Sequence, residues 1–242
     1  MTSSIEKQIV RCNMKIVGLQ KLTLLDFPGQ TACTVFTAGC NFRCPFCHNS
    51  DVIYASNEEI PQEEFFEFLQ SRKGKLDGVC ITGGEPLLQS DIIEFMAKIR
   101  ALGFLIKLDT NGSIYGKLEY IIKNRLCDYV AMDVKNSVEK YNLTAGAVVD
   151  VQNVVKSIDL LKGQNLVNYE FRTTVVKGLH EIDDFKDISR LISGAKAYYL
   201  QQYKDCEKVL NRSYSAYSEG QMKQILQVVK SAGIANAHLR GV

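Results

Sequence analysis

Short apolar runs rich in β-branched residues alternate with amphipathic runs along most of this chain. Six apolar runs of five to eight residues predict β-strands, at 31–37, 78–82, 104–110, 129–134, 169–176 and 197–201. The amphipathic runs predict helices that begin at Pro61 and after Ser90 as N-cap, and others near 117–123, 149–161, 183–192 and 219–232. This alternation is typical of an α/β fold in which crossover helices join parallel strands.

Six strand–helix units are fewer than the eight of a closed barrel. Either an open doubly wound sheet or an incomplete barrel fits, and periodicity alone does not separate the two. The chain has only four prolines and no low-complexity stretch, charge block or Pro/Gly/Ser linker. We therefore expect one domain over 1–242, with a core at about 15–205 and a C-terminal helical extension at about 206–242.

Composition narrows the possible partners. The chain has 242 residues, and 29 Lys and Arg against 27 Asp and Glu give a net charge of +2, which does not suit a strongly basic nucleic-acid binder. The longest apolar run, counting glycine, is six residues, whereas a membrane span needs about 20. The first residues have no apolar stretch behind a basic head, so we expect no secretory signal and a cytoplasmic location.

Polar residues follow the predicted strands at their C-terminal ends. The segments concerned are a cysteine-rich loop after the first strand, Thr82-Gly-Gly-Glu-Pro86, Asp109-Thr-Asn-Gly112, Asp133-Val-Lys135, Arg172 and Gln201-Gln-Tyr203. In parallel α/β folds these ends line one face, where ligands bind. Loops are polar in any protein, but here carboxylates, a lysine and an arginine converge with a group of thiols.

The eight cysteines fall into two classes. Five are scattered singly and are expected to be small buried hydrophobic residues: Cys12, Cys33, Cys80, Cys127 and Cys206. Cys40, Cys44 and Cys47 share one short loop, which in a reducing compartment favours a metal site over disulfides.

Three kinds of metal site compete for this loop. A structural zinc could recruit His48, although its position beside Cys47 would need a cramped turn. The segment from Cys44 to His48 also matches a haem-attachment pattern, which requires export. The third is a four-iron cluster on three cysteines, which leaves one iron open to a ligand.

The loop resembles the hallmark of the radical S-adenosylmethionine superfamily, since Phe46 precedes the last of the three cysteines. Three further segments resemble motifs of that family: Thr82-Gly-Gly-Glu-Pro86, Leu108-Asp-Thr-Asn-Gly112 and Met132-Asp-Val-Lys135. Together with Gly39-Cys and Cys47-His-Asn49 they are similar to glycyl-radical-enzyme activases. Leu22-Thr-Leu-Leu-Asp-Phe-Pro-Gly29 and the segment 169–175 resemble the longer form of anaerobic ribonucleoside-triphosphate reductase activating proteins. The resemblance extends from about Lys15 to the end of the chain.

The resemblance implies an incomplete (βα)6 TIM-like barrel of parallel strands, with additional N- and C-terminal segments. It also implies a [4Fe-4S] cluster held by Cys40, Cys44 and Cys47, whose open iron S-adenosylmethionine chelates. No catalytic residue is expected beyond the cluster and the cofactor. The residues expected to bind the cofactor are Asn49, Thr82, Gly83, Gly84, Glu85, Asp109, Asn111, Asp133, Lys135 and Arg172.

Most of these residues have a more specific expected role. The two glycines would let the backbone approach the ligand, and Thr82 and Asn49 would contact its amino-acid end. Asp109 and Asp133 would face the sulfonium or a monovalent cation, and Lys135 and Arg172 would bind the carboxylate or the ribose. Some relatives end the sixth strand with a histidine, whose role would pass here to Gln202 or Tyr203.

The implied function is reductive cleavage of S-adenosylmethionine to a 5′-deoxyadenosyl radical, which generates a glycyl radical on anaerobic ribonucleoside-triphosphate reductase. Flavodoxin or ferredoxin would supply the electron. The alternatives are an activase of another glycyl radical enzyme such as pyruvate formate-lyase, or a small-molecule enzyme such as a deazapurine carboxylate synthase. A non-catalytic zinc or iron–sulfur protein is a further alternative.

Overall fold

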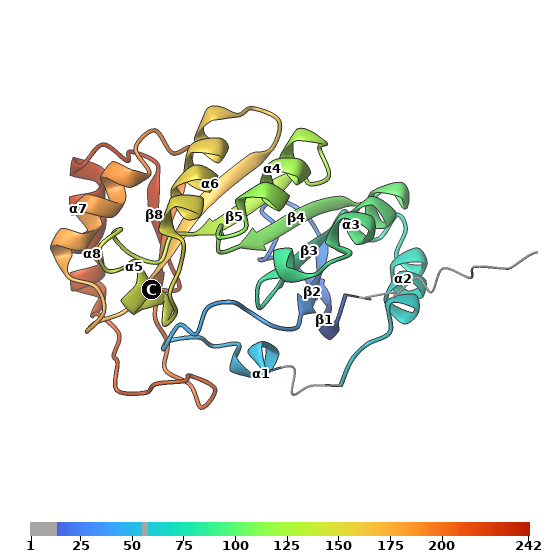
Figure 1. Ribbon diagram of the computed structural model, residues 1–242, viewed down its shortest axis with the longest axis horizontal. Coiled ribbons are helices and arrows are strands. Elements are labelled where there is room, and N and C mark those ends of the chain that lie inside the picture. Colours follow the sequence, from blue (N-terminus) through green and yellow to red (C-terminus); the bar gives the residue numbers. More distant parts are fainter. Residues whose placement is uncertain (1–13, 55–57) are drawn as a thin grey trace, which may run out of the picture.

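The computed structural model describes residues 14–54 and 58–242. Within them the strands form one eight-stranded sheet in sequence order, flanked by helices (Figure 1). The strands are β1 (Ile16–Thr23), β2 (Ala32–Thr37), β3 (Gly78–Gly83), β4 (Leu105–Thr110), β5 (Tyr129–Asp133), β6 (Asn168–Val175), β7 (Tyr198–Gln202) and β8 (Ala237–Arg240). β1 pairs with β2 in an antiparallel sense, and all other neighbouring strands are parallel.

The six predicted strands correspond to β2–β7, and their ends agree to within one residue. They confirm the predicted open, incomplete barrel of parallel strands, and the described chain adds two strands that were not predicted, one at each edge of the sheet. β1 was missed because its exposed second half breaks the apolar pattern, and its pairing with β2 contains register shifts. β8 was missed because it has only four residues. The sheet remains open, since the described residues contain no pairing between β1 and β8.

The helices occupy the predicted segments. The long ones are α2 (Gln62–Ser71), α3 (Ile92–Ala101), α4 (Tyr115–Lys123), α6 (Val151–Gly163), α7 (Ile182–Leu191) and α8 (Glu219–Ser231). Three short ones were not predicted: α1 (Ser50–Ile53), the 3-10 helix η1 (Pro86–Leu88) and α5 (Tyr141–Ala145). Asp91 rather than Ser90 directly precedes α3, so the predicted N-cap was one residue too early. Pro61 precedes α2 instead of opening it.

The two faces of the sheet differ in chemistry. Along β4, Ile106 and Leu108 are fully buried and belong to the apolar core beneath the helices. Because successive strand residues point to opposite faces, Lys107 and Asp109 lie on the inner face of the open barrel. The outer face of the sheet therefore packs apolar residues against the helices, and its inner face carries charged residues inside the open barrel.

The segment after 205 is more than a helical extension. It contains α8, as expected, and also β8, which pairs in parallel with β7. Arg240 on β8 reaches the fully buried Glu170 on β6, with Nη1 2.9 Å from Oε1. The C-terminal strand thus contributes a side chain to the interior of the barrel.

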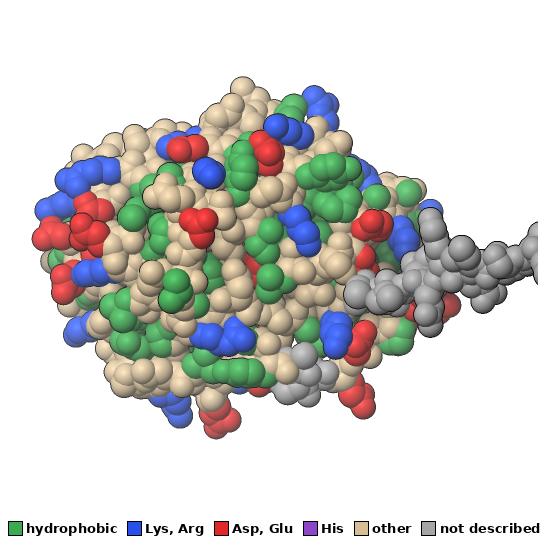
Figure 2. Space-filling view, in the orientation of Figure 1, with side chains coloured by type: hydrophobic (Ala, Val, Ile, Leu, Met, Phe, Trp, Pro, Cys, Tyr) green, Lys and Arg blue, Asp and Glu red, His purple; other side chains and the backbone are tan. Residues whose placement is uncertain are grey.

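The single cysteines mostly behave as predicted. Cys33, Cys80 and Cys127 are buried, whereas Cys206 is half-buried, and Cys12 lies outside the described residues. No helix in the described ranges is long and apolar enough to cross a membrane. Acidic and basic side chains are interspersed on the face shown in Figure 2, as the balanced composition suggests.

Candidate active site

An open cavity of about 280 Å³ lies at the C-terminal ends of the parallel strands. It is lined by the three loop cysteines together with Phe42, Phe46, His48, Asn49, Ile53, Thr82, Gly83, Gly84, Asp109, Thr110, Asn111, Asp133, Lys135, Arg172, Thr174 and Gln201. Nine of the ten residues predicted to bind the cofactor are in this set, and Glu85 is not. The turns after several separate strands thus meet at one cavity.

The cysteine loop follows β2 and is supported from behind by α5. The backbone N–H of Arg43 donates to the carbonyl of Ala145 at 2.9 Å. Gly146 ends α5 in the left-handed region (φ +61°), and a Cβ there would lie 2.1 Å from the Arg43 carbonyl oxygen. Only glycine permits this contact, so the turn after α5 fixes the path of the loop between Cys40 and Cys44.

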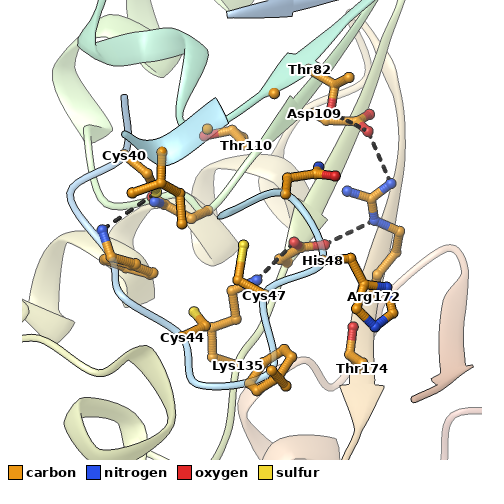
Figure 3. Close-up of a pocket in the computed structure, with 18 of the residues that line it drawn as sticks. Cys40, Cys44, Cys47, His48, Thr82, Asp109, Thr110, Lys135, Arg172 and Thr174 are labelled. Carbon is orange, nitrogen blue, oxygen red and sulfur yellow. Dashed lines mark hydrogen bonds and ion pairs between the residues drawn. The ribbon is translucent and has the colours of Figure 1, made fainter. Parts of the chain in front are cut away.

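The three thiols are arranged around the cavity (Figure 3). Cys44 is buried, and Cys40 and Cys47 are half-buried. Among the described residues no three Cys, His, Asp or Glu side chains converge tightly enough to hold a single metal ion. Separated thiolates that line one cavity instead suit a cluster, in which each cysteine binds a different iron.

Burial and local charge act in opposite directions on these thiols. Burial raises the pKa of Cys40 to about 12, while the Phe42 backbone N–H and the charge of Lys135 lower it. Burial likewise raises the pKa of Cys44 and Cys47, and Lys135 again opposes the effect. Lys135 is therefore the side chain that favours the thiolate form of all three.

The segment after β7 covers the outer side of the cysteine loop. The Asn211 backbone N–H donates to the Pro45 carbonyl at 2.8 Å. The Ser50 hydroxyl donates to the Lys208 carbonyl at 2.6 Å. His48 packs against Tyr203, with ring centroids 5.8 Å apart. The histidine next to Cys47 thus lies against an aromatic ring.

Two glycines at the end of β3, Gly83 and Gly84, allow close packing of the protein backbone. A Cβ at Gly83 (φ +121°) would lie 2.3 Å from the backbone nitrogen of Thr37. A Cβ at Gly84 would lie 1.9 Å from the carbonyl oxygen of Gly39. Both missing side chains therefore face β2 and the start of the cysteine loop, so contacts within the protein already require glycine at both positions. Both glycines also line the cavity, and the close approach of their backbone to a ligand stays a prediction.

Glu85 binds the protein itself rather than lining the cavity. Its fully buried carboxylate accepts hydrogen bonds from the Leu87 N–H, the Thr110 hydroxyl and the Asn111 N–H, at 2.7–3.1 Å. Burial raises its pKa to about 7, although these three donors oppose the shift. Glu85 thus holds the turn after β4 in place.

The turn after β4 is also hydrogen-bonded to the cysteine loop. The Asn111 side-chain amide donates to the Asn41 Oδ1 at 2.9 Å, and the Asn41 amide donates to the Ser113 hydroxyl at 2.8 Å. The Ser113 hydroxyl donates back to the Asn111 Oδ1 at 2.6 Å. This closed ring of hydrogen bonds connects the residue after Cys40 to the end of β4.

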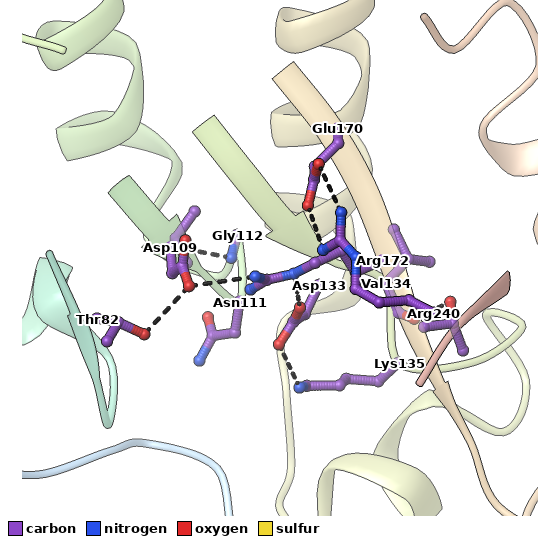
Figure 4. Close-up of polar contacts among 12 residues, drawn as sticks. Thr82, Asp109, Asn111, Gly112, Asp133, Val134, Lys135, Glu170, Arg172 and Arg240 are labelled. Atoms are coloured by element: carbon purple, nitrogen blue, oxygen red, sulfur yellow. Dashed lines mark hydrogen bonds and ion pairs between the residues drawn. The ribbon is translucent and has the colours of Figure 1, made fainter. Parts of the chain in front are cut away.

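A chain of charged side chains crosses the inner face of the sheet from β3 to β6 (Figure 4). The Thr82 hydroxyl donates to Asp109, and Arg172 bridges the two aspartates, through Nη1 to Asp109 at 3.1 Å and through Nε to Asp133 at 2.9 Å. Lys135 binds the other oxygen of Asp133 at 2.9 Å, and Lys107 contacts Asp109. Each carboxylate therefore has two cationic partners.

Charge compensation keeps both aspartates ionised. Burial raises the pKa of Asp133, but the charges of Arg172 and Lys135 outweigh it, and the net pKa lies well below the ordinary value. The same balance of burial against Arg172 and Lys107 lowers the pKa of Asp109. Three cationic side chains face two carboxylates, which leaves an excess positive charge suited to an anionic ligand group.

Sequence reasoning did not single out Thr174 or Lys107. Thr174 lines the cavity two residues after Arg172, so strand alternation could have identified it. Gln201, the first residue of the predicted segment 201–203, lies opposite Thr174 on β7 and lines the cavity as expected. Gln202 and Tyr203 do not, because the Gln202 amide donates to the Tyr217 carbonyl and Tyr203 is buried. Lys107 was visible only as a charge within an apolar strand.

Comparison with known proteins assigns the family. Residues 34–192 match the model of the Radical SAM superfamily, a range that contains the cysteine loop and the strand ends β3–β6. The chain belongs to the radical SAM superfamily. The three loop thiols fit the superfamily's [4Fe-4S] cluster, because they are separate soft donors around one cavity. The cationic side chains beside them fit S-adenosylmethionine, because the excess positive charge matches its carboxylate.

Relatives of this radical SAM protein carry names that describe different activities. "Putative glycyl-radical enzyme activating enzyme MJ1227" of Methanocaldococcus jannaschii is 32% identical over 225 residues, covering 89% of this chain and 91% of that protein. Pyruvate formate-lyase-activating enzyme of Clostridium pasteurianum is 34% identical over 128 residues, covering 50% of this chain and 52% of that protein. The 7-carboxy-7-deazaguanine synthase of Thermoplasma acidophilum is 32% identical over 128 residues, covering 53% and 57%.

Solved structures agree on the fold of this radical SAM protein. A domain of pyruvate-formate lyase-activating enzyme from Bacteroides vulgatus superposes with a TM-score of 0.56 at 19% identity, over 68% of this chain and 99% of that one. At this identity the likeness concerns the fold alone. It agrees with the open, mostly parallel sheet described above.

Proposed function

We propose that the protein is an activase that generates a glycyl radical on anaerobic ribonucleoside-triphosphate reductase. With the cluster reduced, S-adenosylmethionine would be cleaved to a 5′-deoxyadenosyl radical that takes a hydrogen atom from a glycine α-carbon of the partner. The observation that carries the activase class is the likeness over 91% of a protein named as a glycyl-radical enzyme activating enzyme.

The chain's own residues would position the cofactor. Cys40, Cys44 and Cys47 would hold the cluster, while Lys135 and Arg172 would bind the carboxylate of S-adenosylmethionine with the excess positive charge at the cavity. Asn49, Thr82 and Asn111 would supply neutral hydrogen bonds from the cavity wall. Gly83, Gly84 and Glu85 would act indirectly, by packing the β3 turn against the cysteine loop and the β4 turn.

A monovalent cation near Asp109 and Asp133 remains part of the proposal, with one structural condition. Arg172 bridges the two carboxylates, so a cation there would have to displace the guanidinium or bind beside it. We further propose that the protein works in the cytoplasm and receives its electron from a flavodoxin or ferredoxin.

The open sheet supports a macromolecular substrate. β1 and β8 do not pair with each other within the described residues, so the barrel wall is incomplete. A lateral opening can admit a peptide loop, whereas a closed barrel exposes only its end. This favours a glycine in a folded partner over a small free substrate.

The ribonucleotide reductase is proposed from the leader that precedes β2. In the structure this leader lies at the N-terminal ends of the parallel strands, opposite the cavity. Phe27 is buried there against Tyr129, with ring centroids 6.2 Å apart, while Leu24 and Leu25 are 68% and 90% exposed. The leader therefore supports the subfamily as a sequence signature and makes no contact with the cavity.

Two other targets have support of their own. Pyruvate formate-lyase is favoured by the relative from Clostridium pasteurianum, and a deazapurine precursor by the synthase from Thermoplasma acidophilum. Both likenesses cover about half of each chain, whereas the first relative matches almost end to end.

Electron paramagnetic resonance discriminates among these targets. The reconstituted protein, a reductant and S-adenosylmethionine are mixed with the reductase, with pyruvate formate-lyase, or with no partner. We expect a glycyl doublet with the reductase that disappears when the reductase's radical glycine is replaced by alanine. A doublet with pyruvate formate-lyase alone would overturn the target and keep the class. Turnover of a deazapurine precursor without any doublet would overturn the class.

A further inference from the structure

His180 is a buried histidine that does not line the cavity. It lies in the turn between β6 and α7, and its side chain belongs to a residue that is only 1% exposed. The ring packs against the fully buried Phe185, with ring centroids 5.6 Å apart. Both ring nitrogens of a buried imidazole need hydrogen-bond partners, because an unpaired buried polar atom is costly.

Both nitrogens of the His180 ring have backbone partners. Nδ1 lies 3.1 Å from the Val176 backbone nitrogen, which donates to it, and 3.3 Å from the Val176 carbonyl oxygen. Nε2 lies 2.8 Å from the carbonyl oxygen of Lys135. A carbonyl oxygen can only accept, so Nε2 carries the proton and Nδ1 is the acceptor. Burial lowers the pKa of His180 below its ordinary value, which agrees with a neutral ring.

The contact from His180 completes the anchoring of the Lys135 backbone. The Thr173 hydroxyl donates to the Val134 carbonyl at 2.6 Å, and this carbonyl belongs to the peptide group that precedes the Lys135 Cα. The His180 ring holds the carbonyl of the peptide group that follows it. Two side chains, one from β6 and one from the turn after it, therefore hold the peptide planes on both sides of one Cα. These planes determine the direction in which the Lys135 side chain leaves the backbone.

The direction of Lys135 matters because its ammonium group lies at the cavity. Nζ binds Asp133 at 2.9 Å, as Figure 4 shows, and lies 5.8 Å from the ring centroid of Phe46 in the cysteine loop. Lys135 also lines the cavity and is part of the excess positive charge there. A charge-assisted hydrogen bond weakens when donor and acceptor are misaligned, so the position of this ammonium group governs how well it binds an anion.

We propose that His180 is a positioning residue for S-adenosylmethionine, because its Nε2–H holds the Lys135 carbonyl and thereby aims the Lys135 ammonium group at the carboxylate of the cofactor. His180 does not line the cavity and acts through Lys135. This inference deepens the proposed function, since it rests on the role of Lys135 given there. It is independent of which partner enzyme is activated.

Two amide variants separate the two hydrogen bonds of the ring. The short side chain of His180→Asn places its amide where Nδ1 lies, so it can accept from the Val176 N–H but does not reach the Lys135 carbonyl. The longer side chain of His180→Gln places its amide N–H where Nε2 lies, so it can donate to Lys135. Each variant removes one hydrogen bond, and the free energy of unfolding should fall in both.

Equilibrium dialysis of S-adenosylmethionine against the anaerobically reconstituted protein measures the effect. At equal iron content we expect about tenfold weaker binding in His180→Asn and binding within about twofold of wild type in His180→Gln. His238→Asn is the matched control, because His238 is exposed on β8 and contacts Asn236. It should bind the cofactor as wild type does. Full affinity in His180→Asn, or an equal or larger loss in His180→Gln, would overturn the proposal.

A cofactor analogue that lacks the carboxylate excludes a general disturbance of the cavity. Decarboxylated S-adenosylmethionine has no group for the Lys135 ammonium to bind. Wild type and His180→Asn should therefore bind this analogue equally well. The same loss for the analogue as for S-adenosylmethionine would overturn the proposal, because the variant would then act on the cavity as a whole.

A measurement on the unaltered protein keeps the proposal decisive if His180→Asn does not fold. NMR of the reconstituted protein, with heavy nitrogen in its histidines and the cluster oxidised, reports where each ring carries its proton. We expect His180 to carry one proton at neutral pH, on Nε2. A charged ring, or a neutral ring with its proton on Nδ1, would overturn the proposal.

Lys135→Met separates failure of this inference from failure of the proposed function. The variant should bind S-adenosylmethionine weakly, and adding His180→Asn should weaken the binding no further, because both changes act through one side chain. Full affinity in Lys135→Met would refute the role that the proposed function gives to Lys135. Weak binding in Lys135→Met together with full affinity in His180→Asn would refute this inference alone.

Discussion

Replacing Gly84 by alanine should disturb the cysteine loop as well as the cofactor cavity. The added Cβ would lie 1.9 Å from the Gly39 carbonyl oxygen and 3.2 Å from the Cys40 Cβ. Contacts of this kind are rarely shorter than about 3 Å, because the atoms then overlap. The β3 turn and the cysteine loop must therefore separate by about 1 Å, exactly where Cys40 begins the cluster motif.

The size of the effect follows from what that separation breaks. Overpacking of a tightly packed site costs about 1–3 kcal/mol. The hydrogen bond from the Glu85 N–H to the Gly39 carbonyl, 2.9 Å long, joins the same two segments and contributes about 0.5–1.5 kcal/mol. We expect Gly84→Ala to lower the free energy of unfolding by about 2–4 kcal/mol, a large part of the 5–15 kcal/mol typical of a domain.

Urea unfolding of the metal-free protein under anaerobic conditions measures this loss, and iron per chain after reconstitution measures the effect on the cluster site. Gly116→Ala in α4 is the control, because its Cβ would meet nothing within 4 Å. The control should be unchanged or more stable by about 1 kcal/mol, since alanine favours a helix. Full iron content and wild-type stability in Gly84→Ala would refute the packing argument.

Three further predictions concern the cavity. Serine at any one of the three loop cysteines should abolish iron binding, whereas serine at any of the four single cysteines in the described chain should leave the iron content unchanged. Iron analysis after reconstitution measures both. Burial raises the pKa of Glu85 from 4.5 to about 7, so the folded state holds this proton at a higher pH than the unfolded state does. Between pH 4.5 and 7, wild type should therefore lose up to about 3 kcal/mol of stability relative to Glu85→Gln. Parallel curves of stability against pH for the two proteins would contradict this. Arg172→Gln leaves Asp109 and Asp133 without their bridge, and we expect a loss of about 3–5 kcal/mol and at least tenfold weaker S-adenosylmethionine binding, measured by urea unfolding and equilibrium dialysis.

The central strands were predictable because they follow a simple physical rule. β2–β7 are buried on the helix side and carry continuous apolar runs, so their ends could be located to within one residue. The edge strands lack that signal, because β1 is exposed over much of its second half and β8 is short. Edge pairing depends on the neighbouring strand more than on local sequence, and these two strands were accordingly not predicted.

The members of the cavity were predictable, but the function of each within it was less so. Motif spacing placed nine of the ten proposed contacts at the cavity, because the ends of parallel strands meet on one face. It could not distinguish Glu85, which bonds to the β4 turn, from residues that face the cavity. Nor could it show that Gly83 and Gly84 pack against the chain, since that depends on tertiary contacts between β3 and the cysteine loop.

The central claim is that a radical formed from the cofactor in this cavity removes a hydrogen atom from a glycine of a partner enzyme. Mass spectrometry of the 5′-deoxyadenosine product tests it directly when the partner reductase carries glycine deuterated at the α-carbon. The account predicts 5′-deoxyadenosine that contains one deuterium, in step with the growth of the glycyl doublet. Product without deuterium, formed while the partner's glycine keeps its label, would contradict the account.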